Sequence, residues 1–370
     1  QGIITIGDAP VQSCKFEEVI RIAGLDQVIK YYNENAEINL RLVDFRKWAG
    51  YPRKCGGIQQ EELDGDPEGY TLVNLGDYSE FTGLNDYQKF RVTNYDKCQM
   101  QRYHNTDAHS YVIANSCLQA DVIINLPKLK THRKAGMTGA LKNMVGIIGS
   151  KDCLPHHRVG SQNEGGDEYL HKDTRKRIAT YLSEAIDTTD KHWLACLQST
   201  ARLLTHATKY ILPYRDDYYE GSWYGNDTIP RTIVDLNKII KFADRQGILQ
   251  LTPQRQNLTI VDAIIAGEKE GPLEPSPKYC GTLIAGENPV AVDLVCSQIM
   301  GFDYSRIPTI IHATHAHTHS MLFTKAIEEV TIQADDIIPL REIYASYGVD
   351  FIPTSGWKGH IERSSQGFKS

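Results

Sequence analysis

Residues 120–149, ADVIINLPKLKTHRKAGMTGALKNMVGIIG, decide the fold that we expect for this chain. The apolar run at 120–126 predicts a buried strand that ends at Pro127, and residues 138–148 repeat apolar side chains with helical spacing. We expect a loop at 128–134 between the two. Short apolar strands and helices also alternate on both sides of this stretch. The sequence therefore predicts an α/β fold with a mostly parallel sheet flanked by helices.

The texture of the sequence changes near residue 160, where a polar, glycine-rich segment leads into helical and tyrosine-rich stretches. The α/β texture returns near residue 251. We expect a single α/β domain from residues 1–159 and 251–350, with a helical and irregular insertion at 160–250. An irregular C-terminal tail would cover residues 351–370.

The composition excludes several classes of protein. Charged residues make up 23% and hydrophobic residues 41%, as in ordinary soluble domains. We find no apolar run long enough to span a bilayer and no repeated basic face, so we expect neither a membrane span nor a nucleic-acid partner. The sequence leaves open whether the chain forms a homo-oligomer.

The eight cysteines include no C-x-x-C pair, which argues against an intrinsic iron–sulfur cluster and against a zinc ribbon. A chain of this size does not need disulfides for stability. We therefore expect reduced thiols and a cytoplasmic location.

A basic island spans residues 128–158. It holds seven Lys or Arg against one acid, a local charge of +6 in a chain whose net charge is -6. Such a concentration favours an anion site over a generally basic surface. Histidines in the same stretch titrate near neutral pH. The basic residues are Lys128, Lys130, Arg133, Lys134, Lys142, Lys151 and Arg158, and the histidines are His132, His156 and His157.

Two parts of the island predict how an anionic substrate would be bound. Along an extended loop, Lys128, Lys130 and His132 would share one side, and the amides at the start of the following helix would favour an anion. On that helix, Lys142 would anchor the substrate and Asn143 would orient it. The strip beside them holds glycines 139, 146 and 149, which indicates close approach either by a ligand or by a neighbouring segment.

The third part of the island, His156-His157-Arg158, follows Pro155. We expect His132, His156 or His157 to transfer protons and Arg158 to clamp a pair of oxygens, unless the paired histidines are simply solvated.

Three further groups of residues have weaker patterns. Glu168 and His171 have the i,i+3 spacing of a carboxylate–histidine metal pair on a helix. The sequence therefore leaves open whether a divalent metal binds there. The run His312, His315, His317 and His319 predicts an exposed helix that binds metal only adventitiously. Asp293 would anchor a helix rather than bind a ligand, and Asp8, at the exit of the first strand, has the same two interpretations.

Five segments resemble the domain-of-unknown-function 362 family. They are LPKLKTH (126–132), GALKNMVGIIG (139–149), GNDTIPRTIVDLNKII (225–240), IVDAIIAGEKEGP (260–272) and ENPVAVDLVCSQIMGFD (287–303). Members of this family often carry ferredoxin-type cysteine clusters, which this chain lacks. Some occur with surface-polysaccharide or natural-product pathways, so the resemblance implies biosynthetic tailoring, without a mechanism.

These patterns favour an enzyme that acts on a small carboxylate- or phosphate-bearing substrate by Lys/His acid–base chemistry. Isomerisation, group transfer and oxidoreduction all stay open. The alternatives are a non-catalytic anion-binding or scaffold protein and a redox protein that uses an external iron–sulfur or flavin partner.

Overall fold

A computed structural model describes residues 2–36, 38–53, 58–93, 97–189, 191–315 and 322–363. Its strands are β1 Ile3–Asp8, β2 Asn39–Asp44, β3 Trp48–Pro52, β4 Ile58–Glu62, β5 Tyr70–Asn74, β6 Phe90–Arg91, β7 Ser110–Ala114, β8 Val122–Asn125, β9 Lys128–His132, β10 Gly136–Thr138, β11 His157–Arg158, β12 Gln256–Glu270, β13 Glu274–Gly286, β14 Thr331–Gln333 and β15 Ile337–Pro339. Its helices are α1 Phe16–Ile22, α2 Leu25–Asn35, α3 Lys97–Tyr103, α4 Asn115–Gln119, α5 Ala140–Asn143, α6 Thr174–Thr188, α7 His192–Ala207, α8 Thr228–Phe242, α9 Pro289–Ile299, α10 Pro308–Thr314 and α11 Ile343–Tyr347.

The largest sheet has five strands and is mixed. The long strand β12 pairs antiparallel with β13, while β8 and then β9 pair with it in parallel. β10 completes the sheet as the antiparallel partner of β9. The fold is α/β as expected, but the mostly parallel sheet is not confirmed, because this sheet combines both kinds of pairing.

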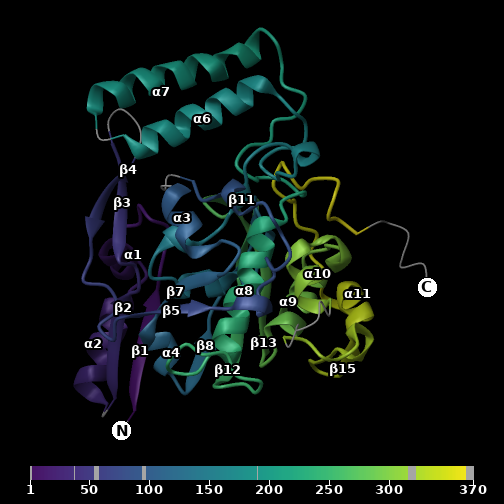
Figure 1. Cartoon of the computed structure of the whole chain (residues 1–370). Helices are drawn as coiled ribbons and strands as arrows, with labels where there is room; N and C mark the ends of the chain where they lie inside the picture. Colours follow the sequence, from purple (N-terminus) through teal and green to yellow (C-terminus); the bar gives the residue numbers. More distant parts are fainter. Residues whose placement is uncertain are drawn as a thin grey trace.

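Helix α8 lies between two hydrophobic cores, near the centre of Figure 1. Ile229 and Ile233 on this helix join the core built around β9, β12 and α9. Leu236 and Ile239, further along it, join the core that contains β7. A helix that is apolar on several sides is typical of a buried position, and α8 therefore connects the two halves of the molecule.

The predicted loop at 128–134 is wrong in its first part. Residues 128–132 form β9, which turns back through β10 as a short hairpin. The helix expected at 138–148 is also shorter: α5 covers Ala140–Asn143 and continues as a 3-10 turn, Met144–Ile147. Gly146 lies within this 3-10 turn, and glycine is a poor residue for a helix interior.

The region predicted as an insertion, 160–250, contains three long helices. α6 and α7 form a hairpin at the top of Figure 1, away from the mixed sheet, whereas α8 is central. The insertion boundaries stay a prediction. Beyond them, residues 351–363 form no helix or strand, yet Trp357 and Ile361 are buried in the core around β9.

None of the helices in the described parts of the chain is long and apolar enough to cross a membrane. Cys196, on α7, is disulfide-bonded. The expectation that all eight thiols are reduced is therefore wrong at this position.

Candidate functional site

Six lysine and histidine side chains of the basic island lie close enough for their charges to affect one another. We call them the Lys–His cluster. β9 and its turn contribute three of them, α5 one, and the chain that follows α5 two. Their charges are close enough for Lys142 to depress the pKa of both His132 and His156. The members are Lys130, His132, Lys134, Lys142, Lys151 and His156. The basic island is thus a three-dimensional cluster in these residues, not only a sequence pattern.

Lys142 is half-buried, and its ammonium group has no hydrogen bond or ion pair with any described residue. Burial, followed by the charges of Lys151 and Lys130, lowers its pKa to about 7. The carboxylate of Asp8 opposes this shift. At neutral pH the amine is therefore divided between its charged form, which can bind an anion, and its neutral form, which can accept a proton.

Asp8 is packed against the glycine strip near Lys142. A Cβ atom on Gly146 would lie 2.1 Å from Oδ1 of Asp8, so glycine is needed there to admit the carboxylate. Asp8 is solvent-exposed, yet partial burial of its carboxyl group raises the pKa above the usual value. The charge of Lys151 opposes this rise. Lys151 in turn donates to the carbonyl of Pro10 at 2.8 Å. The close approach expected at this glycine is thus made by a side chain of the protein.

His132 has a fixed hydrogen-bond pattern. Its Nδ1 atom accepts from the backbone amides of Lys134 and Ala135, both at 3.1 Å. Burial, and then the charges of Lys142 and Lys130, hold the pKa of the ring well below its usual value. The ring is therefore neutral at pH 7, and its proton is on Nε2.

His156 has the opposite pattern. Its Nδ1–H donates to the carbonyl of Leu154 at 2.8 Å. Burial, and then the charge of Lys134, keep its pKa well below the usual value. This ring is also neutral, with the lone pair on Nε2. Neither Nε2 atom has a hydrogen-bond partner among the described residues.

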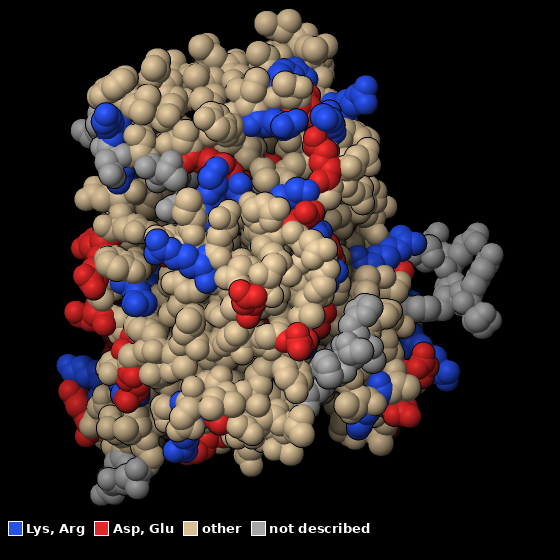
Figure 2. Space-filling model, viewed as in Figure 1, with Lys and Arg blue, Asp and Glu red and all other residues tan. Residues whose placement is uncertain are grey.

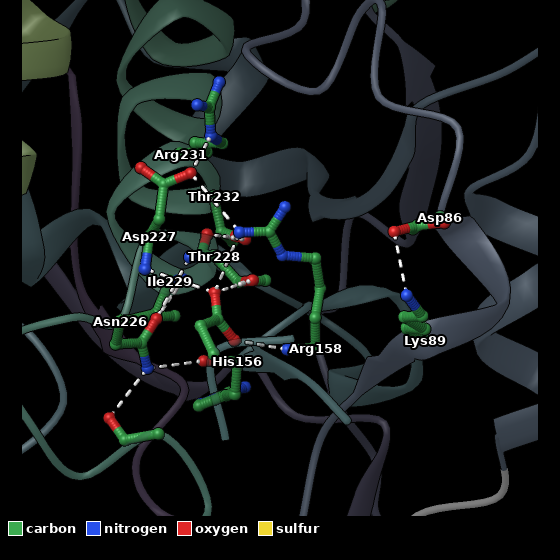
Figure 3. A network of polar contacts seen from close by, with 12 residues as sticks. Asp86, Lys89, His156, Arg158, Asn226, Asp227, Thr228, Ile229, Arg231 and Thr232 are labelled. Carbon is green, nitrogen blue, oxygen red and sulfur yellow. Dashed lines mark hydrogen bonds and ion pairs between the residues drawn. The ribbon is translucent and has the colours of Figure 1, made fainter. Parts of the chain in front are cut away.

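The start of α8 holds the segment that carries His156 (Figure 3). Asn226, two residues before the helix begins, accepts from the amides of its first two residues, Thr228 and Ile229. Its amide nitrogen donates to the carbonyl of His156 at 3.0 Å. Thr232, one turn along, donates to the carbonyl of Pro155 at 2.8 Å. The position of the histidine ring is thus set by a buried helix.

His157 lies next to His156, in the short strand β11. It pairs with Arg91 in the short ladder of β11 and β6, and its buried Nδ1 atom has no partner among the described residues. Burial, and then the charge of Lys134, lower the pKa of its ring well below the usual value. His157 is buried, and its role in proton transfer stays a prediction.

Arg158 was expected to clamp substrate oxygens, but the structure gives its guanidinium two carboxylate partners (Figure 3). The Nη2 atom lies 3.4 Å from Asp167 and 3.5 Å from Asp227. Asp167 also accepts a hydrogen bond from the hydroxyl group of Thr228 at 2.6 Å. Arg158 therefore joins the β11 segment to the start of α8 through Nη2, and its role as a clamp stays a prediction.

Lys128 and Asn143 also have partners outside the cluster. Lys128 is exposed and ion-paired with Asp262. Asn143 donates to the side-chain oxygen of Asn125 at 2.7 Å, and Asn125 donates to the carbonyl of Ala140 at 2.8 Å. Asn125 lines a separate cavity of about 250 Å³. Alternate residues of β9 point to the same side of the strand, as expected for Lys128, Lys130 and His132, but the ammonium group of Lys128 is engaged by Asp262.

The predicted anion site at the backbone amides of the helix start is wrong, because a carboxylate of the protein already occupies it. Asp293 accepts from the amide of Ala140 at 2.6 Å and from that of Leu141 at 3.1 Å. Burial raises the pKa of Asp293 to about 7. The interpretation of Asp293 as a helix anchor is correct, and Gly139 gives it room.

The two histidine patterns with metal-like spacing differ from their predictions. Glu168 and His171 lie in a loop rather than on a helix, and Glu168 accepts from the amide of Gly160 and the hydroxyl of Thr180. Burial raises the pKa of Glu168 to about 7. Within the described ranges, no three His, Cys, Asp or Glu side chains are grouped as a metal site would require.

His312 is buried rather than exposed. Its Nε2 atom lies 2.6 Å from Asp227, the residue that precedes α8. His317 and His319 lie outside the described residues.

Three members of the site were not among the predicted binding residues. Lys134 and Lys151 belonged to the basic island, so their charge was the signal that could have identified them. Asp8 could be found only as a carboxylate at a strand exit, because nothing in its local sequence indicates contact with residue 146.

Comparison with known protein families matches residues 74–298, more than half of the chain, to the domain of unknown function DUF362. The chain belongs to this family. The DUF362 match includes all the lysines and histidines of the cluster but not Asp8. The resemblance inferred from the five segments is therefore confirmed.

The chain is also 24% identical over 208 residues to the thylakoid-associated protein sll1697 of Synechocystis sp.. That alignment covers 55% of this DUF362 chain and 41% of the relative, so the chain spans less than half of the relative's length. No solved structure matches.

Proposed function

We propose that this chain is an enzyme that binds a small carboxylate- or phosphate-bearing substrate at the Lys–His cluster and transfers protons with His156. The observation that carries the proposal is the pair of neutral rings with opposite tautomers beside Lys142. His156 presents a lone pair at Nε2, whereas His132 presents a proton there. A base and a hydrogen-bond donor next to a cation are the groups that proton transfer on an anionic substrate requires.

Binding would depend on the lysines. Lys142 has no partner among the described residues, and burial lowers the pKa of Lys130, Lys134 and Lys142 alike. An anion placed between these amines would favour their charged forms and would replace the hydration that each has lost. The cluster is thus better suited to an anion than to a cation.

Proton transfer would follow from the tautomers. The Nε2 atom of His156 would take a proton from the substrate, and the resulting imidazolium would return it to the product. The Nε2–H group of His132 would donate a hydrogen bond to the oxygen on which negative charge develops. This scheme is simplest for an isomerisation, and group transfer with the same base is an alternative. The family resemblance supports a biosynthetic role.

Calorimetric titration with inorganic phosphate and with malonate tests the binding step. Lys142→Met should weaken binding of the preferred anion by about tenfold or more. Lys128→Met is the matched control, because Lys128 belongs to the same island but is paired with Asp262. Equal loss in both variants, or no loss in Lys142→Met, would contradict the proposal.

A screen of anionic metabolites for turnover tests the catalytic step. His156→Gln should abolish turnover and leave anion binding intact. Binding without any turnover by the unmodified protein would favour the non-catalytic anion-binding alternative.

A cytoplasmic location stays part of the proposal. The disulfide at Cys196 is an observation against it, since cytoplasmic thiols are usually reduced. Thiol alkylation of protein extracted without reductant would decide this point.

A further inference from the structure

A cavity of about 250 Å³ lies between helix α8 and the strands β8 and β12. α8 contributes Asn237 and Ile240, which are three positions apart and therefore on one side of the helix. β12 contributes Asn257 and Thr259, alternate residues that point to the same face of the strand. Sites for drug-sized ligands typically measure roughly 300–1,000 Å³, so this cavity suits a smaller molecule of one or two rings.

Two buried polar side chains in the cavity wall have unused hydrogen-bonding capacity. Thr259 is 2% exposed, and its hydroxyl group has no hydrogen-bond partner among the described residues. Asn237 is 4% exposed, and its Nδ2 atom donates to the carbonyls of Leu141 at 2.9 Å and Ile233 at 2.8 Å. Its Oδ1 atom accepts from none of the described residues. Because buried polar groups are normally paired, these two groups indicate that a polar ligand enters the cavity.

The other lining residues indicate the shape of that ligand. The half-buried carboxamide of Asn257 has no partner among the described residues, so it offers a donor and an acceptor side by side. Met144 and Ile240 belong to the core that contains β7, whereas Leu322 belongs to the core around β9. Apolar contacts therefore come from both cores. A planar heterocycle has apolar faces and a polar edge, and an asparagine side chain can pair with such an edge through two hydrogen bonds.

The charge of the cavity favours an uncharged ligand. Among the described residues that line it, the charged ones are Lys241 and Glu287, which have opposite signs. Lys241 also donates to the carbonyl of Leu322 at 3.3 Å. Figure 2 shows few charged side chains on the surface around the lower end of α8. The cavity thus differs in character from the Lys–His cluster, none of whose six members lines it.

We propose that this cavity binds an uncharged nucleobase, either free or as its nucleoside. The ring would pack between apolar side chains of the two cores, and its edge would form hydrogen bonds with Asn257 and Thr259. This binding site does not depend on the proposed acid–base function.

Calorimetric titration of the full chain with adenosine, inosine, cytidine and uridine tests the proposal. At least one of these nucleosides should bind the wild type. Thr259→Val should lower its affinity by about fivefold or more, the effect of one lost hydrogen bond, and Asn257→Leu should do so at least as strongly. Thr259→Val removes a hydroxyl group that has no partner in the protein, so this variant should melt at the wild-type temperature or above it.

The matched control is Thr309→Val, which removes another buried hydroxyl group without a described partner, on α10 and outside the cavity. It should bind the nucleoside like the wild type, and inorganic phosphate should not displace the nucleoside. The proposal is overturned if none of the four nucleosides binds, if Thr259→Val binds as well as the wild type, or if phosphate competes. Binding of methyl glucoside in place of every nucleoside would also overturn it and would assign the cavity to a sugar.

Discussion

His132 and His156 use the same ring atom in opposite ways: Nδ1 of His132 accepts two backbone hydrogen bonds, and Nδ1 of His156 donates one. Because both rings are kept neutral by burial and by neighbouring lysines, the two Nε2 atoms differ as donor and acceptor. A pair of this kind can hold a substrate oxygen and accept a substrate proton without any change in net charge before the reaction.

This difference predicts two distinct nitrogen spectra. In ¹⁵N-labelled protein at pH 6.5, long-range ¹H–¹⁵N correlations should give His132 as the Nε2–H tautomer and His156 as the Nδ1–H tautomer, both neutral. Assignment follows from the spectra of His132→Gln and His156→Gln, each of which should remove one ring. Two rings of the same tautomer, or a protonated ring at this pH, would refute the proposed roles.

Lys142 predicts the pH dependence of anion binding. Its pKa of about 7 in the free protein means that the ammonium form declines as the pH rises above 7. The affinity for phosphate should therefore fall between pH 7 and pH 9, approaching about tenfold per pH unit while the bound amine stays charged. Lys142→Met should bind weakly with a flatter profile, whereas Lys128→Met should keep the wild-type profile. A wild-type affinity that does not change over this range would exclude Lys142 as the anchor.

The sequence predicted which residues carry the charge, but not which of them face one another. Lys142 and His156 were found because an uneven distribution of charge is visible in one dimension. The pairing of Arg158 with Asp227, some 70 positions away, depends on the packing of α8 against β11 and has no local signal.

Short elements account for most of the differences in the fold. β9 and β10 have five and three residues, too few for a periodic pattern to distinguish a strand from an extended loop. The start of α5 was located nearly correctly from sequence, but its amides are satisfied by Asp293, 153 positions later. No rule based on neighbouring residues could assign that acceptor in advance.

Asp293 predicts a link between stability and the site. Asp293→Ala would leave the buried amides of Ala140 and Leu141 without acceptors, at a cost of about 2–4 kcal/mol in the free energy of unfolding. Asp293→Asn keeps one carbonyl oxygen and should lose about half as much. Urea unfolding measures both, and phosphate affinity should fall in the same order, because α5 carries Lys142. Equal stabilities of the alanine and asparagine variants would contradict the role of the carboxylate as a cap.

The buried pair His104 and His109 predicts a loss of stability in acid. His104 donates from Nε2 to the carbonyl of Cys153 at 2.9 Å, and the two Nδ1 atoms lie 3.4 Å apart. Burial lowers the pKa of His104 to about 3 and that of His109 to about 4. Below pH 6.5 the unfolded chain binds protons that the native rings refuse, so folding stability must fall as the pH drops towards these values.

The expected slope from His104 alone is roughly 1 kcal/mol per pH unit between pH 6 and pH 4. His104→Gln can keep the hydrogen bond to Cys153 and cannot titrate, so its unfolding free energy should fall less steeply over this range, even if it starts lower. His171→Gln, a change in a half-buried loop histidine, should keep the wild-type slope. If the His104 variant is as acid-sensitive as the wild type in urea titrations, the loss of stability must originate in other groups, such as His132 and His156.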